Sequence, residues 1–428
     1  MMLGMAKFLI EGGKTLAGEI EVAGSKNAAL KIFPAIFLTD EAIRISNLPT
    51  IEDVARAEEM VAALGHDVKK LDERTIEIKS KNRACIDLSG NLVNKFRASI
   101  MFVGPMLASC GEVRFPHPGG DVIGTGQRPI DMFLDGFVKM GAKVEANEGH
   151  YKLTAGRLRG ADIFFPKITV TGTESLMMTA TVADGVTILK NCAMEPEVKA
   201  LADYLTSVGA KIEGAGTPTV KITGVRNLRG GEYKIIPDRI EAGTFAIMAA
   251  AVQTHGEGEV LIKDFIPEHL EVLWFLFDKI GVRYALEKSA VRIMPSNELK
   301  AHEVKTHEYP GFVTDLQSAY TVLMTQAHGA SLIYETIYDR RLLYTDLLVQ
   351  MGANIIMADP HRVMVAGPTK LAGRKLVSPD IRAGIALIIA ALIAEGETEI
   401  DNIYQIDRGY EKLDERLNKL GAQIKRVE

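Results

Sequence analysis

The hydrophobic and polar positions of this 428-residue chain follow one pattern that recurs along its whole length. Six segments carry apolar residues at a spacing of three to four, which is typical of an amphipathic helix, and each ends in a glycine followed by a short alternating stretch. The glycines are Gly65, Gly141, Gly209, Gly281, Gly352 and Gly421. Because glycine tolerates the left-handed backbone that ends many helices, we predict a helix, a turn and a strand at each of these positions.

A second family of six helices is predicted between the amphipathic ones. Its members, such as "GTFAIMAAAV" and "AGIALIIAALIA", are apolar nearly all round, and helices without a polar face are normally buried. Short strands such as "GEVRF" and "TEIDNI" lie between the helices. Each repeat of about 70 residues is therefore predicted to be a small α/β unit with one outer helix, one inner helix and a few strands.

Six repeats exceed what one hydrophobic core of ordinary size holds, so we predict two domains of three repeats each. The boundary is expected near residues 235–243, where the fourth repeat begins. The last repeat lacks strands that the others have, and the stretches "KFLIEGG" and "GEIEVAG" at the start of the chain could supply them. The first domain is therefore expected to span residues 25–238, and the second residues 1–24 plus 239–428.

Charged and hydroxyl residues stand at or just before the starts of the inner helices. The first N–H groups of a helix are unpaired and carry partial positive charge, so helix starts favour anions. Capping explains any one of these residues equally well, but all six together indicate a shared site if the domains face each other through these ends. That site would collect Lys26, Arg97, Arg128, Arg239, Arg382 and Arg408. Such a basic cluster suits a phosphorylated substrate, and Asp315 would be a candidate base within it.

The composition, with 47% hydrophobic and 25% charged residues, is that of a soluble globular protein. A formal net charge of −5 offers no general attraction for nucleic acid or a membrane surface, so neither is an expected partner. The longest apolar run is shorter than the roughly 20 residues of a membrane span, and no signal-peptide pattern opens the chain, so a cytoplasmic location is expected. Three scattered cysteines predict no disulfide framework, and neither they nor the histidines have the spacing of a metal site.

The stretch "PGGDVIGTGQRP" is rich in glycine and proline and is predicted to be a surface loop, within residues 116–130. It carries one carboxylate, Asp121, and one guanidinium, Arg128. Its "GTG" is no dinucleotide-binding fingerprint, because the third glycine is missing.

The chain resembles the UDP-N-acetylglucosamine 1-carboxyvinyltransferase family from end to end, through several motifs that occur in the same order. They are "GSKNAAL", "RASI", the "PGG…RPID" loop, "PDRIEAGTF", "PGFVTD", "DIRAG" and "IDRGYE". The resemblance implies an α/β fold of two inside-out barrel domains, each of three repeats, with the active site between them. It also implies transfer of the enolpyruvyl group of phosphoenolpyruvate to the 3′-hydroxyl of UDP-N-acetylglucosamine, which begins peptidoglycan precursor synthesis. The family works by addition–elimination without a metal or organic cofactor, and we expect a monomer.

The resemblance also implies roles for individual residues. The expected catalytic residues are Asp121, Asp315, Lys26, Asn27 and Arg408. The expected phosphoenolpyruvate-binding residues are Lys26, Asn27, Arg128, Arg382 and Arg408. The expected UDP-N-acetylglucosamine-binding residues are Arg97, Arg128, Pro129, Ile130, Asp131, Lys167, Thr169, Val170, Thr171, Asp315 and Ile337. Asp380 would lie in the same cluster.

The sequence departs from most of the family in the loop. Asp121 stands where most members have cysteine; a carboxylic acid can also deliver a proton, provided that a closed, water-poor site keeps it protonated. A carboxylate is a far poorer nucleophile than a thiolate, so we predict resistance to fosfomycin, which alkylates the family's cysteine. The loop is about two residues longer than usual before Arg128, and Phe133 stands where many members have histidine.

Two alternatives remain open at this stage. One is an enolpyruvyl transferase that uses another uridine nucleotide, because Phe133 and the long loop lie near the nucleotide pocket of the family. The other is a non-catalytic paralogue that only binds a sugar nucleotide. The retention of Asp315 and of all the basic residues argues against the second alternative.

Overall fold

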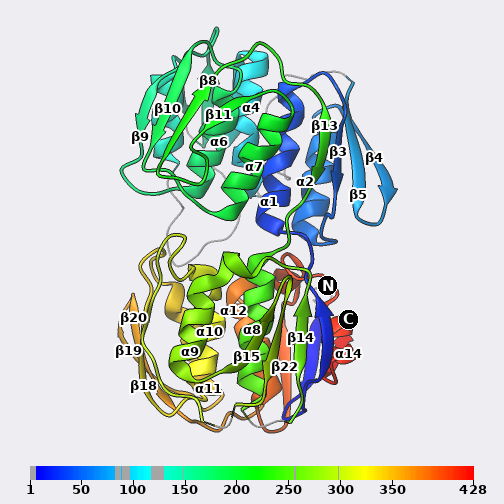
Figure 1. Ribbon diagram of the computed structural model, residues 1–428, viewed down its shortest axis with the longest axis vertical. Helices are drawn as coiled ribbons and strands as arrows, with labels where there is room; N and C mark the ends of the chain where they lie inside the picture. Colours follow the sequence, from blue (N-terminus) through cyan, green and yellow to red (C-terminus); the bar gives the residue numbers. More distant parts are fainter. Residues whose placement is uncertain are drawn as a thin grey trace. The chain divides into compact units, whose positions relative to one another are not determined.

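The computed structural model describes residues 6–81, 88, 97–116, 130–147, 149–254, 257–296 and 298–428. These residues form two compact units. Unit 1 combines the N-terminal segment up to Ala23 with residues Pro237–Glu428, and unit 2 takes the described residues between Gly24 and Ile236. Each unit is built from three repeats of helices and a small sheet, coloured along the sequence in Figure 1.

Unit 2 begins with a helix that is shorter than its apolar pattern suggests. The helices of this unit are α1 (Lys26–Ile32), η1 (Phe33–Leu38), α2 (Glu52–Ala63), η2 (Arg97–Ser99), α4 (Ile100–Cys110), α5 (Asp131–Lys139), α6 (Val170–Ala180) and α7 (Pro196–Ser207). The α-helix ends at Ile32 and continues as a 3₁₀ turn, because Pro34 has no N–H for the helical ladder.

The strands of unit 2 form three separate sheets. They are β3 (Ile43–Ser46), β4 (His66–Asp72), β5 (Thr75–Ser80), β6 (Glu112–Pro116), β7 (Lys143–Asn147), β8 (His150–Thr154), β9 (Asp162–Phe164), β10 (Val186–Lys190), β11 (Lys211–Glu213), β12 (Thr219–Thr223) and β13 (Gly231–Lys234). Their orders are β13-β3-β5-β4, β6-β8-β7 and β11-β12-β10-β9. Strand β13 pairs in parallel with β3, so the last strand of the unit completes the sheet of its first repeat.

Unit 1 repeats this plan. Its helices are α8 (Arg239–Val252), η3 (Pro267–Leu270), α9 (Glu271–Ile280), α10 (Thr314–Met324), η4 (Arg341–Tyr344), α11 (Thr345–Gln350), α12 (Ile381–Ile393), α13 (Tyr404–Asp407) and α14 (Leu413–Lys419). Its strands are β1 (Lys7–Glu11), β2 (Gly18–Glu21), β14 (Val260–Lys263), β15 (Arg283–Glu287), β16 (Ala290–Met294), β17 (Val304–Lys305), β18 (Gly329–Tyr334), β19 (Asn354–Asp359), β20 (Arg362–Gly367), β21 (Lys375–Val377), β22 (Glu397–Asp401) and β23 (Gln423–Val427).

The N-terminal strands belong to the sheets of unit 1. Strand β1 lies between β22 and β23 and is antiparallel to both, so both of its edges are hydrogen-bonded. Strand β2 pairs in parallel with β14. The sheet orders are β21-β22-β1-β23, β15-β16-β14-β2 and β17-β18-β20-β19. The two termini therefore meet in one sheet, where Lys7 is the register partner of Val427.

The six glycines predicted to end the outer helices all adopt positive φ. The angles are 88° at Gly65, 99° at Gly141, 113° at Gly209, 85° at Gly281, 105° at Gly352 and 100° at Gly421. A side chain with a Cβ is strained in this region of φ, so glycine is the residue that lets each chain segment turn from helix to strand. This confirms the predicted helix–turn–strand repeat.

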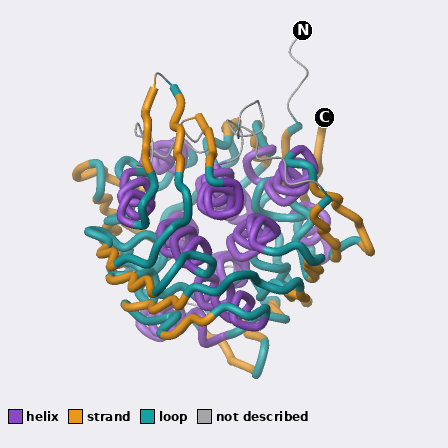
Figure 2. The backbone as a smooth tube through the Cα atoms, turned by 90° about the horizontal axis from the view of Figure 1, so that it is seen from above, coloured by secondary structure: helices purple, strands orange, loops and turns teal. Residues whose placement is uncertain are grey.

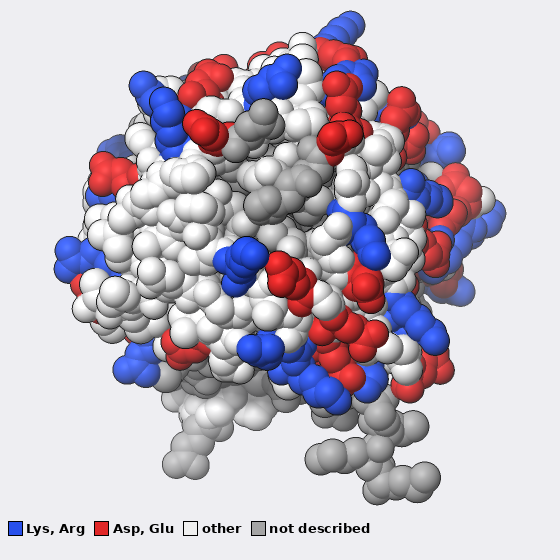
Figure 3. All heavy atoms as spheres, turned by 90° about the horizontal axis from the view of Figure 1, so that it is seen from below, with Lys and Arg blue, Asp and Glu red and all other residues white. Residues whose placement is uncertain are grey.

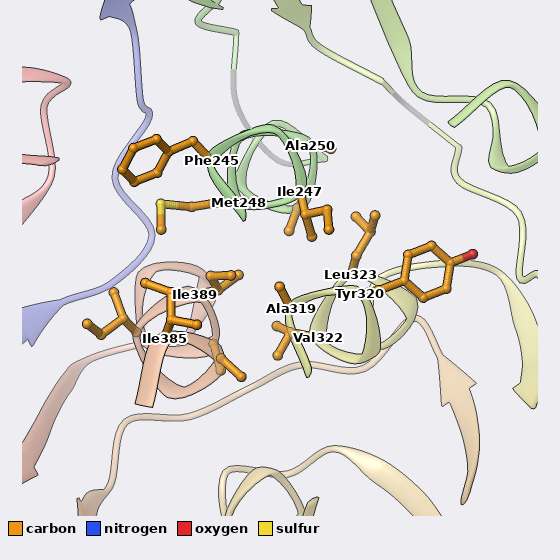
Figure 4. Packing of buried hydrophobic residues seen from close by; sticks show 14 of the residues in the cluster. Phe245, Ile247, Met248, Ala250, Ala319, Tyr320, Val322, Leu323, Ile385 and Ile389 are labelled. Carbon is orange, nitrogen blue, oxygen red and sulfur yellow. The ribbon is translucent and has the colours of Figure 1, made fainter. Parts of the chain in front are cut away.

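The inner helices are buried, as their apolar sequences predict. Every residue of α8 is buried, and α8, α10 and α12 pack against one another in the core of unit 1 (Figure 4). In that view Ile247 of α8, Ala319 of α10 and Ile389 of α12 point into the space between the three helices. Strands lie outside the helices (Figure 2). Each unit is thus a barrel turned inside out, with helices at its centre.

The surface carries no dominant sign of charge on the face drawn in Figure 3, where basic and acidic side chains are interspersed. Among the described residues, no helix is both long and apolar enough to cross a membrane. Cys192 is a buried free thiol, but Cys110 is disulfide-bonded. The prediction that the cysteines form no disulfide framework therefore does not hold for Cys110, since sequence spacing does not report distance in space.

Candidate active site

The starts of the inner helices carry polar side chains in both units. Thr169 caps α6 by accepting the N–H of Gly172 at 3.1 Å. Asp238 caps α8 by accepting two backbone N–H groups at 2.8 and 3.0 Å. Asp380 caps α12 in the same way, at 2.8 and 2.9 Å. These caps satisfy some of the unpaired helix N–H groups, and they fix the first turns that carry the other predicted site residues.

Asp315, the second residue of α10, lies between two guanidinium groups. Nη2 of Arg341 donates to its Oδ1 at 3.0 Å, and Nη2 of Arg382 donates to its Oδ2 at 3.0 Å. Arg341 belongs to η4 and Arg382 to the first turn of α12, so two different elements hold one carboxylate. Charge-assisted hydrogen bonds of this kind favour the ionised carboxylate, which is the form that a general base requires.

The other nitrogens of the two guanidinium groups are also engaged. Nη1 of Arg382 donates to the Tyr410 hydroxyl at 3.2 Å, and that hydroxyl lies 3.1 Å from Oγ1 of Thr244. Nη1 of Arg341 donates to Oγ1 of Thr314 at 2.9 Å. The planar guanidinium fork lets each arginine hold a carboxylate and a hydroxyl at once, which fixes its orientation.

Burial and neighbouring charges shift the pKa values of Arg382, Arg341 and Tyr410. Burial is the largest single effect and lowers the pKa of the Arg382 guanidinium, but Asp315, Tyr410 and Asp238 together outweigh it, so the pKa is raised. The pKa of Arg341 is raised for the same reasons, with Glu335 as a second carboxylate. Burial also raises the pKa of the Tyr410 hydroxyl, against the effect of Arg382. Both arginines therefore stay cationic at any physiological pH.

Two further predicted residues lie in unit 1. Arg408 directly follows α13 and is buried, and its Nη1 donates to Oε1 of Gln405 at 3.0 Å. Ile337 lies in the turn after β18, where its N–H donates to Oε1 of Glu335 at 2.8 Å. Unit 1 therefore contains Asp315, Ile337, Arg382 and Arg408, and within this set Arg382 is hydrogen-bonded directly to Asp315.

In unit 2, Lys26 opens α1 and is buried. Its Nζ lies 2.7 Å from Oδ2 of Asp53, near the start of α2, and Ser25 caps the helix by accepting the N–H of Ala28 at 3.3 Å. Asn27 is the next residue of the helix. The ion pair with Asp53 joins the start of α1 to the start of α2.

The remaining predicted residues of unit 2 lie at two other helix starts. Lys167, Thr169, Val170 and Thr171 lie at the beginning of α6, and Ile130 and Asp131 lie at the beginning of α5. Arg97 begins η2. Asp121, Arg128 and Pro129 lie outside the described residues, as does most of the predicted loop.

The sequence pattern did not single out Arg341, Tyr410, Thr314, Glu335 or Asp53. Arg341 directly follows Arg340 at the start of η4, and neither periodicity nor a motif distinguishes the two in the sequence. The signal that could have found Thr314 is its place beside Asp315, because a hydroxyl there can orient a neighbouring donor. Among the described residues, no group of three or more metal-ligating side chains could hold a metal ion.

Solved structures define the class of the fold. The structure of the enolpyruvyl transferase NikO from Streptomyces tendae matches with a TM-score of 0.89 at 24% identity, over 99% of each chain. A structure of EPSP synthase from Acinetobacter baumannii matches with a TM-score of 0.75 at 16% identity, over 99% of this chain and 100% of that chain. The fold is that of the enolpyruvyl transferases, which confirms the predicted fold class.

Sequence comparison then gives the family. The family model described as EPSP synthase (3-phosphoshikimate 1-carboxyvinyltransferase) matches residues 10–417. Relatives from Koribacter versatilis (strain Ellin345) and Desulfatibacillum aliphaticivorans are 44% and 43% identical over 99% of this chain, and over 97% and 100% of their own. Both are named UDP-N-acetylglucosamine 1-carboxyvinyltransferase. The chain belongs to this family of carboxyvinyltransferases.

Proposed function

We propose that the protein transfers the enolpyruvyl group of phosphoenolpyruvate to the 3′-hydroxyl of UDP-N-acetylglucosamine and releases phosphate, as a step of peptidoglycan precursor synthesis. The observation that carries the proposal is the Asp315 carboxylate at the start of the inner helix α10, held by Arg341 of η4 and by Arg382 at the start of the inner helix α12. The chain that carries this arrangement is 44% identical to a relative named UDP-N-acetylglucosamine 1-carboxyvinyltransferase. The arrangement supplies both a base and the cations that phosphorylated substrates need.

In the addition step, Asp315 accepts the proton of the 3′-hydroxyl of the sugar. The 3′-oxygen forms a bond to C2 of phosphoenolpyruvate at the same time. Asp121 delivers a proton to C3, so that a tetrahedral intermediate forms with no net change in charge on the two carbons. In the elimination step, the Asp121 carboxylate takes a proton back from C3 and the double bond between C2 and C3 re-forms. The bond from C2 to the phosphate oxygen breaks, and phosphate departs with the proton that Asp315 had accepted. No oxidant, reductant or metal is required by this balance.

The basic residues have a separate task. Lys26, Arg128, Arg382 and Arg408 bind the phosphate and carboxylate of phosphoenolpyruvate, and Asn27 contacts the reacting sugar. The uridine and diphosphate are bound by the residues at the starts of α5 and α6, by Arg97 and by Ile337. Two anionic substrates repel each other, so their approach depends on these fixed positive groups. We further propose that the protein acts in the cytoplasm as a monomer, without a cofactor.

The test is phosphate release from phosphoenolpyruvate by the purified full-length protein, with UDP-N-acetylglucosamine, UMP and shikimate 3-phosphate as separate acceptors. We expect release with the first acceptor and, by mass spectrometry, a product that carries the enolpyruvyl group. Phosphate release with UMP or shikimate 3-phosphate, but not with UDP-N-acetylglucosamine, would show that the protein uses a different acceptor. Binding of UDP-N-acetylglucosamine without any phosphate release would make it a non-catalytic binder.

A further inference from the structure

Glu335 is a buried carboxylate to which no role has been given above. It directly follows β18 and is 0% exposed. Its Oε1 accepts the N–H groups of Ile337 and Tyr338 at 2.8 and 3.1 Å. Its Oε2 accepts the hydroxyl of Thr314 at 2.7 Å. One side chain therefore holds both the turn at residues 336–338 and the first residue of α10.

The Thr314 hydroxyl extends this constraint to Asp315. Nη1 of Arg341 donates to Oγ1 of Thr314 at 2.9 Å, and Nη2 of the same guanidinium donates to Oδ1 of Asp315 at 3.0 Å. A hydroxyl has a single hydrogen. Because Thr314 accepts from Arg341, it directs that hydrogen to Glu335, and Glu335 has to be the acceptor.

We infer that Glu335 is a positioning residue for the proposed transfer: it orients Asp315 through Thr314 and Arg341, and it orients Ile337 through the turn. The inference rests on the proposed function for the roles of Asp315 as base and Ile337 as a nucleotide contact. It adds that one carboxylate anchors both. Binding of the acceptor and removal of its proton therefore depend on a common group that touches neither substrate.

The electrostatics of the cluster agree with this geometry. Burial lowers the pKa of Arg341, and Asp315, Glu335, Tyr338 and Asp380 together outweigh burial and raise it, with Asp315 and Glu335 as the two largest contributors. Four other charged or titratable groups face the cluster. Arg382 binds the second oxygen of Asp315, and the ring centroid of Tyr338 is 5.1 Å from the Arg341 guanidinium carbon. Asp380 acts on Arg341 through its charge, and Nδ1 of His361 is 3.0 Å from the Glu335 carbonyl oxygen.

The variant Glu335→Gln tests the inference because it preserves size but introduces a donor. In one amide orientation the NH₂ group faces the Thr314 hydroxyl. That hydroxyl can then no longer donate to residue 335, and its hydrogen is turned toward the N–H group of Arg341, which is also a donor. In the other orientation the NH₂ group faces the N–H groups of Ile337 and Tyr338. Each orientation leaves one donor opposed to another, so the variant loses one of the two anchoring functions.

Steady-state kinetics measured as a function of pH separate the effect of Glu335 on Asp315 from its effect on the turn that carries Ile337. For Glu335→Gln we expect the acid limb of the kcat/KM profile to move up by about one pH unit, since Asp315 loses part of one cationic partner. We also expect the KM for UDP-N-acetylglucosamine to rise about tenfold as the turn loosens. Thr314→Val removes only the hydroxyl, so the acid limb should move while the KM stays. Thr314→Ser keeps the hydroxyl and is the matched control, with wild-type behaviour expected.

A wild-type pH profile and KM in folded Glu335→Gln would overturn the inference. If that variant does not fold, as judged by circular dichroism, an unmoved acid limb in Thr314→Val overturns the link to Asp315. Hydrogen–deuterium exchange of the peptide at residues 335–341 in the ligand-free full-length protein needs no activity at all. Faster exchange in Glu335→Gln but not in Thr314→Val supports the inference even if the wild type releases no phosphate, which would refute only the proposed function.

Discussion

The substitution Glu174→Gln is expected to remove a pH dependence from the stability of unit 2. Glu174 lies in α6 and is 0% exposed. Lys31 of α1 contacts its Oε2, and Oε1 has no hydrogen-bond partner. Burial raises the pKa of this carboxyl from its ordinary value of 4.5 to about 7; Lys31 opposes the rise, and the nearby carboxylates of Glu197 and Glu195 add to it. Glutamine has the same shape and does not titrate.

The sign and the size follow from the raised pKa. A carboxyl whose pKa is higher in the folded state adds stability that is fully present below pH 4.5 and is lost as the pH rises through 7. The gap between 4.5 and about 7 corresponds to on the order of 3 kcal/mol, at about 1.4 kcal/mol for each pKa unit. The unfolding free energy of the wild type minus that of Glu174→Gln should therefore fall by this amount between pH 4.5 and pH 8.

Urea unfolding at a series of pH values measures this difference. The single tryptophan, Trp274, lies in α9 of unit 1, so its fluorescence reports unit 1, while far-ultraviolet circular dichroism reports both units. Glu59→Gln, at an exposed position of α2, is the matched control and should show no change in the difference. Infrared spectroscopy of the protonated carboxyl should give a midpoint near pH 7 for Glu174, and a higher one in Lys31→Met. A difference in unfolding free energy that stays flat from pH 4.5 to pH 8 would refute the reasoning.

Three further predictions concern the site and the core. Asp315→Asn should lower kcat for phosphate release by about two orders of magnitude or more, with UDP-N-acetylglucosamine binding retained in calorimetry; near-normal turnover would exclude its role as base. The wild type should show no time-dependent inactivation by fosfomycin, whereas Asp121→Cys should acquire it, and inactivation of the wild type at low drug concentration would contradict this. Gly384→Ala should destabilise unit 1 by about 1–3 kcal/mol in urea unfolding, because a Cβ would lie 2.7 Å from Cγ1 of Ile406. Gly156→Ala, with no atom within 4 Å of its Cβ, is the control, and equal midpoints for the two variants would be the contrary result.

The repeated fold could be predicted from the sequence because its determinants are local. A glycine with positive φ, an amphipathic helix before it and an alternating strand after it occupy consecutive positions, and all six glycines adopt that conformation. The buried inner helices were predictable for the same reason, since a helix that is apolar all round has one stable environment. The early end of α1 at Ile32 shows the limit, because Pro34 overrides the apolar pattern at one point.

The contacts within the candidate site could not be predicted in this way. Asp315 meets Arg341 across 26 residues of sequence and Arg382 across 67. Lys31 meets Glu174 across 143 residues. Such pairs depend on which helix starts the packed repeats bring together, and neither composition nor periodicity carries that information. Their positions at helix starts singled out Asp315 and Arg382, and the family resemblance then gave them roles, but Arg341 and Glu335 emerged only from the coordinates.

Arginine at positions 341 and 382 fixes the orientation of the positive charges around Asp315. Each guanidinium binds a carboxylate oxygen through one terminal nitrogen and a hydroxyl through the other, so its plane is fixed before any substrate arrives. An ammonium group would bind the same carboxylate from many directions, because it is a point charge on a flexible stem. In the proposed reaction, a substrate anion meets cations whose orientation is set by Asp315, Thr314 and Tyr410. The ordering that transfer requires is thereby made during folding rather than during the reaction.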